Sequence, residues 1–209
     1  MGRHDTALKL TESRSCLIRG LYASTPVQTA FGWQAASSLV PGDLVMTKDD
    51  GLRPIVSAHT EFRRALWSVR LPDGAMSNSA MMMLPPGQPV LIRTRYALPF
   101  SGDDLALVPV TTLEGWRGIA PHVPARDEPI LHLRLARAGI IFVSHGLMTG
   151  CEGTDDSAFD IHRLLDCPTR PTLPLAAARQ MVAHLVADEA GDALLACQAA
   201  DLRAPPNRE

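Results

Sequence analysis

Short apolar segments alternate with turn residues along most of the first 150 positions. Each segment spans five to seven residues, is rich in Val, Ile, Leu and Thr, and is bounded by Gly, Pro or Asp, which is typical of β-strands. The segments that we predict as strands are 25–31, 43–47, 53–59, 65–71, 88–94, 105–110, 130–136 and 140–146. The pattern therefore predicts a mainly β domain built from short strands and hairpins.

Local turn and helix signals refine this prediction at two places. Leu131, Leu133 and Leu135 alternate with polar residues, and the Ala138-Gly139 turn predicts that 130–136 and 140–145 form a hairpin. The Ala and Ser run in 33–39 predicts one short helix before Pro41.

The composition changes after residue 153. Pro168, Pro171 and Pro174 indicate a linker, and apolar residues then recur at helical spacing. They are Leu175, Ala178, Met181, Val182, Leu185 and Val186. We expect Gly191 to end or interrupt this helix. The predicted parts are a flexible segment over 1–15, a β domain over 16–153, a helical extension over 154–203 and a disordered tail over 204–209.

The helical extension has two interpretations. Its apolar stripe either caps the open end of the β domain or binds a partner, which includes a homodimer through the 175–203 helices. Both interpretations use the same residues.

The composition narrows the class of protein. The chain is 46% hydrophobic and 20% charged, and its formal net charge is −2, with Lys and Arg scattered. These values give no reason to expect nucleic acid or a membrane as partner, and without an apolar leader we expect a cytoplasmic location. The four cysteines are widely spaced and predict free thiols, and we expect no metal and no cofactor.

The segment "GLYASTPVQTAFGWQAASSLVPGDLVMTKDDGLRPI", residues 20–55, resembles the opening of a Hint (hedgehog/intein) domain. The segments 84–93 and 130–147 resemble two later parts of that family in the same order. The matching residues of the first segment are Thr25, Val27, Thr29, Gly32, Gly42, Asp43, Val45, Thr47, Asp50, Gly51 and Pro54. The resemblance covers about 130 residues and implies a β horseshoe, closest in pattern to a bacterial branch found in alphaproteobacteria.

Two turns inside the first segment have a structural explanation. Gly42-Asp43 and Asp50-Gly51 bracket the short strand over 44–47. Glycine supplies positive φ angles, and an Asp side chain bonds nearby amides, so we interpret both pairs as hairpin turns rather than catalytic residues.

The resemblance also implies where the family's chemistry should lie. An active Hint domain uses a Cys or Ser nucleophile, and a Thr and a His that assist it. Counting back from Thr25 puts the nucleophile at Gly20, and the later segment puts the Thr and His at Pro85 and Gln88. None of these three can perform the family's step, so we expect no enzyme activity and a binding role toward an unidentified protein or peptide. The alignment predicts that Gly20 lies at a cleft beside Gln88.

An alternative alignment starts the domain at "CLIRG", residues 16–20. Cys16 would then be the nucleophile of an N-to-S acyl shift, in a domain that cleaves its own chain. This requires a four-residue insertion over 21–24 and a substitute base. The candidate bases are His59, His132 and His145, and a strand end beside Gly146 favours His145.

Overall fold

The computed structural model describes residues 18–62, 67–123, 128–144, 146–154 and 170–201, with side chains as far as Ala190. Cys16 and His145 lie outside the described residues, as do the predicted segments 1–15 and 204–209. The linker predicted around Pro168 lies mostly outside them as well.

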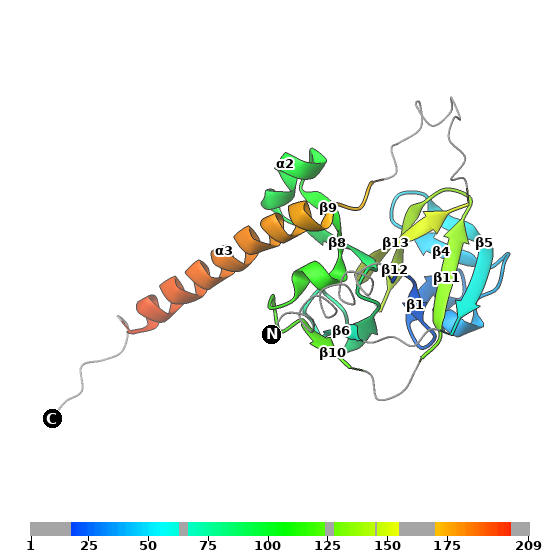
Figure 1. The fold of residues 1–209 in the computed structure, drawn as a ribbon, viewed down its shortest axis with the longest axis horizontal. Helices are drawn as coiled ribbons and strands as arrows, with labels where there is room; N and C mark the ends of the chain where they lie inside the picture. The colour runs from blue at the N-terminus through cyan, green and yellow to red at the C-terminus, as the bar shows by residue number, and fades with distance from the viewer. Residues whose placement is uncertain (1–17, 63–66, 124–127, 145, 155–169, 202–209) are drawn as a thin grey trace, which may run out of the picture.

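Two β-sheets make up the described body, so the mainly β prediction is confirmed (Figure 1). The larger sheet has ten strands in the order β1-β11-β5-β4-β2-β12-β13-β8-β9, with β3 paired to β2, and the smaller has the order β10-β6-β7. The larger sheet comprises β1 (Leu21–Tyr22), β2 (Pro26–Thr29), β3 (Gly32–Ala35), β4 (Leu44–Thr47), β5 (Gly51–Glu61), β8 (Pro89–Arg93), β9 (Leu105–Pro109), β11 (Ile130–Leu135), β12 (Gly139–Val143) and β13 (Leu147–Gly153). The smaller comprises β6 (Ser68–Leu71), β7 (Met82–Leu84) and β10 (Ala120–His122).

Within the described residues the helical elements are few, and all but one are about a single turn long. They are η1 (Ala36–Ser38), η2 (Arg95–Ala97), α2 (Leu98–Ser101), η3 (Val110–Leu113) and the long α3 (Leu175–Asp201). The helix predicted over 33–39 is therefore wrong apart from the one turn of η1. Residues 32–35 form β3 instead, because they pair with β2 and because Thr29 Oγ1 donates to the Gly32 carbonyl at 2.8 Å.

The β4–β5 hairpin has the turn chemistry that the sequence indicates. Thr47 Oγ1 accepts a hydrogen bond from the Asp50 amide at 3.2 Å and donates one to the Gly51 carbonyl at 2.7 Å. At the other end of β4, Asp43 accepts a bond from the Val40 amide at 2.9 Å. Gly42 and Gly51 both have positive φ angles, of 100° and 67°. Local hydrogen bonds from side chains therefore fix both turns. This explains the Gly42-Asp43 and Asp50-Gly51 pairs as structural residues.

The hairpin predicted between 130–136 and 140–145 is wrong. All residues of β11 pair with β5. β12 instead forms a hairpin with β13, and the turn between them begins after Val143. Apolar alternation shows that a strand has a buried face but does not name its neighbour. The long β5 provides β11 with a partner far away in the sequence, and Gly139 begins the next strand instead of sitting in a tight turn.

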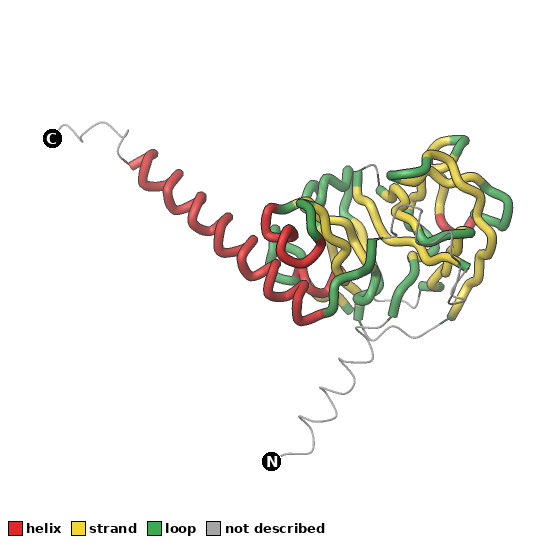
Figure 2. The backbone as a smooth tube through the Cα atoms, turned by 90° about the horizontal axis from the view of Figure 1, so that it is seen from above, coloured by secondary structure: helices red, strands yellow, loops and turns green. Residues whose placement is uncertain are grey.

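Helix α3 packs on the β body through its first half and then projects away from it (Figure 2). Ala178, Met181 and Val182 are buried. Near the middle, the Trp116 indole donates to Glu189 at 2.8 Å, and Arg95 donates to both carboxylate oxygens of Asp188 at 2.7 Å. The first half of the helix therefore packs on the β body, and the choice between a cap and a partner-binding helix stays a prediction.

The helix continues through Gly191, so the predicted end or break at that position is wrong. A glycine inside a helix costs about 1 kcal/mol relative to alanine, which neighbouring helical residues can outweigh. Within the described residues, no helix is long and apolar enough to span a bilayer.

Replacing Met181 by alanine should lower the free energy of unfolding by about 2 kcal/mol, because its side chain is fully buried where α3 joins the main hydrophobic core. Val186→Ala is the matched control on the same helix, since Val186 is 39% exposed, and it should change stability by less than about 0.5 kcal/mol. Urea unfolding of the two variants measures both values. Equal effects would mean that the helix does not cap the β body.

Candidate functional site

Gln88 and Gly20 are in direct contact, as the alignment predicts. The Gly20 amide donates to Gln88 Oε1 at 2.7 Å. The Gln88 side-chain amide donates in turn to Thr149 Oγ1 at 2.6 Å and to the Gly150 carbonyl at 2.9 Å. Gln88 is only 3% exposed, so one buried side chain joins the segment before β1, the start of β8 and strand β13.

A tight turn between β7 and β8 directs Gln88 inward. The backbone amide of Gln88 donates to the Pro85 carbonyl at 3.0 Å, and the Gly87 amide donates to the Ile18 carbonyl at 2.8 Å. Val110 donates to the Gln88 carbonyl at 2.9 Å, which ties the turn to η3. Positions 85 and 86, just before Gly87, can both be proline because neither needs a backbone amide donor.

Gly20 occupies a position that only glycine fits. Its φ angle is +118°, a conformation that residues with a side chain rarely adopt. A Cβ atom there would lie 2.5 Å from Ile130 Cγ2 and 2.9 Å from the Leu131 carbonyl oxygen. The position expected for a nucleophile has no side chain and no space for one.

Thr25 has a structural role in the turn after β1. It is 4% exposed, its amide donates to the Tyr22 carbonyl at 2.9 Å, and its carbonyl accepts from the Ala36 amide at 2.8 Å. These bonds hold the turn that leads from β1 into β2.

His132, one of the three candidate bases, lies beside Gly20. Its Cε1 atom would be 3.4 Å from a Cβ at position 20, and its Nε2 lies 3.2 Å from Glu61 Oε2. The His59 ring stacks on it with the centroids 6.4 Å apart. Of the three candidate bases, the structure brings His132 to the site, while His145 lies outside the described residues. His132 comes close to Gly20 because Leu21 pairs with Leu131. The sequence alone does not show this pairing, so it gave no signal for the position of His132.

A cavity of about 380 Å³ opens beside these residues. Gly20, Gln88 and His132 form part of its wall, and the apolar residues Leu107, Leu133 and Ile140 form another part. Charged side chains from the β4–β5 turn and from residues 19, 137, 152 and 170 complete the lining. This volume lies within the range of small-ligand sites.

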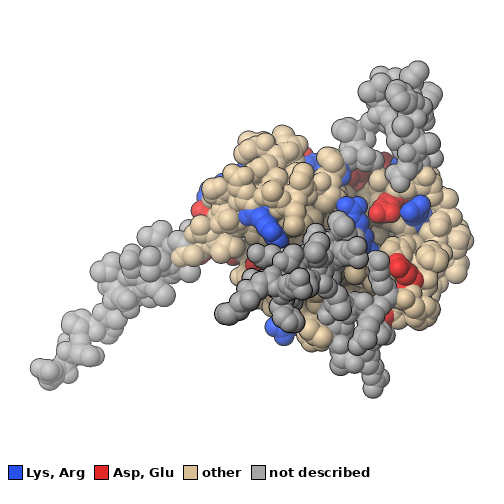
Figure 3. All heavy atoms as spheres, viewed as in Figure 1, with Lys and Arg blue, Asp and Glu red and all other residues tan. Residues whose placement is uncertain are grey.

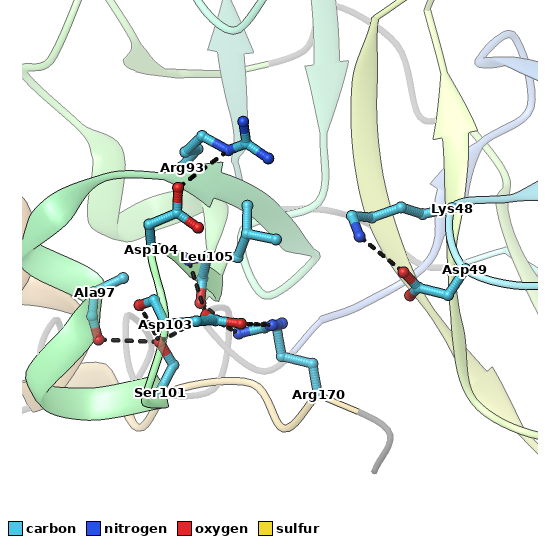
Figure 4. Close-up of polar contacts among 9 residues, drawn as sticks. All are labelled: Lys48, Asp49, Arg93, Ala97, Ser101, Asp103, Asp104, Leu105 and Arg170. Atoms are coloured by element: carbon cyan, nitrogen blue, oxygen red, sulfur yellow. Dashed lines mark hydrogen bonds and ion pairs between the residues drawn. The ribbon is translucent and has the colours of Figure 1, made fainter. Parts of the chain in front are cut away.

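The wall formed by Arg170 is held in place by an ion pair (Figure 4). Arg170 donates to both carboxylate oxygens of Asp103 and to the Leu105 carbonyl. Hydrogen bonding from Arg170 lowers the pKa of Asp103 to about 2. Since this pKa is depressed in the folded protein, the pair is present at neutral pH and is lost only as the pH falls toward 2.

Cys151 also lines the cavity, but its chemistry is blocked. The side chain is buried, Sγ donates to the Leu133 carbonyl at 3.3 Å, and burial raises the pKa of the thiol to about 12. A thiol in this state is a poor nucleophile at neutral pH, because the thiolate is the reactive form.

We therefore expect Cys151 to resist alkylation. At about pH 8 its thiolate fraction is on the order of a thousandfold below that of an exposed cysteine, and burial slows the reaction further. Iodoacetamide labelling followed by peptide mapping should modify Cys151 only after denaturation. Rapid labelling in the native protein would contradict the geometry of β13.

The other candidate groups do not assemble within the described residues. The described part of the chain contains no group of three metal-ligating side chains. Lys, Arg, Asp and Glu are scattered over the face seen in Figure 3, with no large area of one sign among the residues drawn in colour.

In this β horseshoe the segment before β1, the turn before β8 and strand β13 meet at the buried side chain of Gln88. These features together indicate the class of domain. The chain matches the Hint domain family over residues 16–150, and it belongs to that family. The match ends at residue 150, so four residues of the cavity wall come from outside the matched segment, namely Cys151, Glu152, Arg170 and Thr172.

Several solved structures are similar to this chain at low identity. A bacterial intein-like domain from Clostridium thermocellum is 10% identical with a TM-score of 0.44, and the similarity covers 63% of this chain and 98% of that one. The AceL NrdHF class 3 split intein is 11% identical with a TM-score of 0.44, covering 63% and 95%. The MchDnaB-1 intein is 12% identical with a TM-score of 0.38, covering 62% and 98%. None of the curated proteins matches the chain.

Proposed function

We propose that this Hint domain does not cleave its own chain at residue 20 and acts instead as a binding domain for a protein or peptide. The observation that supports this most directly is the hydrogen bond from the Gly20 amide to Gln88. This bond joins the two positions at which the resemblance to the family leads us to expect the nucleophile and the histidine, and neither residue can perform the step.

The chemistry of the two residues supports the proposal separately. An acyl shift needs an atom that attacks the preceding carbonyl, and Gly20 offers none. The departing amine needs a proton, and a glutamine amide does not exchange one near neutral pH. Gln88 also uses its oxygen and its amide nitrogen in bonds that join three segments, so the residue that replaces the histidine works as a clamp.

The cavity supports a binding role. It keeps an apolar wall and several charged side chains next to the clamp, so a partner group could enter without any covalent step.

Self-cleavage from Cys16 is the second candidate, and one observation favours it. His132 contacts Glu61 and lies beside Gly20, where it could serve as the missing base in place of His145. A histidine oriented by a carboxylate is a common arrangement for proton transfer.

The two candidates are separated by comparing the full-length chain with a Cys16→Ala variant during incubation with dithiothreitol. The binding role predicts that both remain full length throughout the incubation. Thiol-accelerated cleavage of the unaltered chain, absent from Cys16→Ala, would instead assign the acyl shift to Cys16. His132→Ala would then test the base.

A further inference from the structure

We infer that the cavity beside Gln88 binds an acidic peptide segment, with side-chain carboxylates directed at the cations of the wall and an apolar side chain on the wall formed by Leu107, Leu133 and Ile140. This inference rests on the proposed binding function and names the chemistry of the partner.

Cations exceed carboxylates in the lining of the cavity. The lining includes Arg19, Lys48, Arg53, Arg137 and Arg170 against Asp49, Asp50 and Glu152. Some of these side chains pair with residues outside the lining, Arg170 with Asp103 and Glu152 with Arg134, and Arg137 also has a partner of its own. The chain as a whole has a net charge of −2, whereas the described lining of the cavity holds more cations than carboxylates.

The orientation of the ion pairs strengthens this contrast. In three pairs the cation is the more enclosed partner and the carboxylate is the more exposed one. The exposed fractions are 28% and 57% for Lys48–Asp49, 28% and 56% for Arg53–Asp50, and 22% and 46% for Arg170–Asp103. Figure 4 shows two of these pairs on separate parts of the fold, Lys48–Asp49 after β4 and Arg170–Asp103 next to β9.

The existing pairs leave these cations able to bind a ligand. Ion pairs between partly exposed side chains contribute little, so a ligand carboxylate that enters the cavity can share a cation at small cost. Inside the cavity the attraction is stronger than at an open surface, because less water screens it. Arg170 is fixed by Asp103 and Leu105, so Lys48 and Arg53 are the better candidates for direct contact.

The cavity wall includes residues from the segment that precedes α3, so the full chain is needed to form it. Arg170 and Thr172 reach it because Thr172 forms a β-bridge with Leu107 and the Leu173 amide donates to the Leu107 carbonyl at 2.8 Å. The segment that leads into α3 thus supplies part of the wall.

The test uses the full chain and two peptides that differ in charge alone, acetyl-Glu-Leu-Glu-amide and acetyl-Gln-Leu-Gln-amide. We expect the acidic peptide to bind with a dissociation constant on the order of 1 mM and the neutral peptide at least about fivefold more weakly. Amide NMR shifts of Gly20, Gly139 and Gly150, which line the cavity, should move, while those of Gly102 and Gly115 should not.

Two matched variants test the contribution of the wall. Arg53→Gln removes a cation of the lining, and Arg93→Gln removes one outside it that also lies on a strand and pairs with an Asp. Arg53→Gln should weaken the acidic peptide about fivefold, and Arg93→Gln should leave its affinity unchanged.

Three results would overturn the inference. They are equal affinity for the two peptides, equal effects of the two variants, and no saturable shift at roughly ten times the expected dissociation constant. The intact mass of the same sample separates this failure from that of the proposed function. A full-length chain that ignores the peptide contradicts only the ligand chemistry, while a cleaved chain contradicts the proposed function itself.

Discussion

Replacing Gln88 by alanine should lower the free energy of unfolding by about 3 kcal/mol. The substitution removes three hydrogen bonds at once and leaves the Gly20 amide, the Thr149 hydroxyl and the Gly150 carbonyl without the side chain that joins them. Leaving a buried polar group unsatisfied costs about 1–3 kcal/mol. Because Gln88 lines the cavity, water can reach part of the gap, which keeps the total below the sum of three full losses.

Gln28→Ala is the control for this variant. Gln28 is a half-buried glutamine on β2, and its loss should change stability by less than about 0.5 kcal/mol. Chemical denaturation followed by far-ultraviolet circular dichroism measures both variants. If Gln88→Ala were as stable as Gln28→Ala, Gln88 would not be a clamp, and its bond to Gly20 would have little structural value.

Introducing a cysteine at position 20 should also destabilise the protein by about 3 kcal/mol, and should not create self-cleavage. The φ angle of +118° costs a residue with a side chain about 1–3 kcal/mol. The new Cβ would in addition lie 2.5 Å from Ile130 Cγ2 and 2.9 Å from the Leu131 carbonyl oxygen, so the neighbours must move. The thiol would still lack a proton donor at Gln88.

Gly102→Cys separates the two costs. Gly102 has a φ angle of +81° but nothing within 4 Å of a Cβ, so this variant measures the backbone cost alone. We expect about 1 kcal/mol for Gly102→Cys, which leaves the remainder at position 20 to packing against β11. Equal losses would mean that the space around Gly20 is larger than the structure shows, and efficient cleavage by Gly20→Cys would mean that the site retains a working base.

The turns and the central contact of the fold could be predicted from the sequence because they depend on residues with strong local preferences or a distinctive order. Asp43 and Gly51 carry their own turn geometry, so the β4–β5 hairpin was predictable. The contact between Gly20 and Gln88 followed from the order of the Hint segments and not from any periodicity.

Long-range pairing could not be predicted in the same way. Leu131, Leu133 and Leu135 show that β11 has a buried face, but they fit equally well beside β12 or β5, and only the assembled sheet decides for β5. For the same reason the sequence could not show that His132 lies beside Gly20. Arg170 gave no sequence signal for the cavity, because it reaches the site through contacts with β9 from a distant part of the chain.

The intact mass of the freshly purified full-length chain, measured with and without dithiothreitol, tests the central claim most directly. If Gly20 and Gln88 form a clamp and no longer a catalytic pair, one species of 209 residues should be found under both conditions, apart from removal of Met1. Loss of the residues that precede Cys16 or Gly20, and above all loss that the thiol accelerates, would contradict the account and show that this Hint domain still cleaves its own chain.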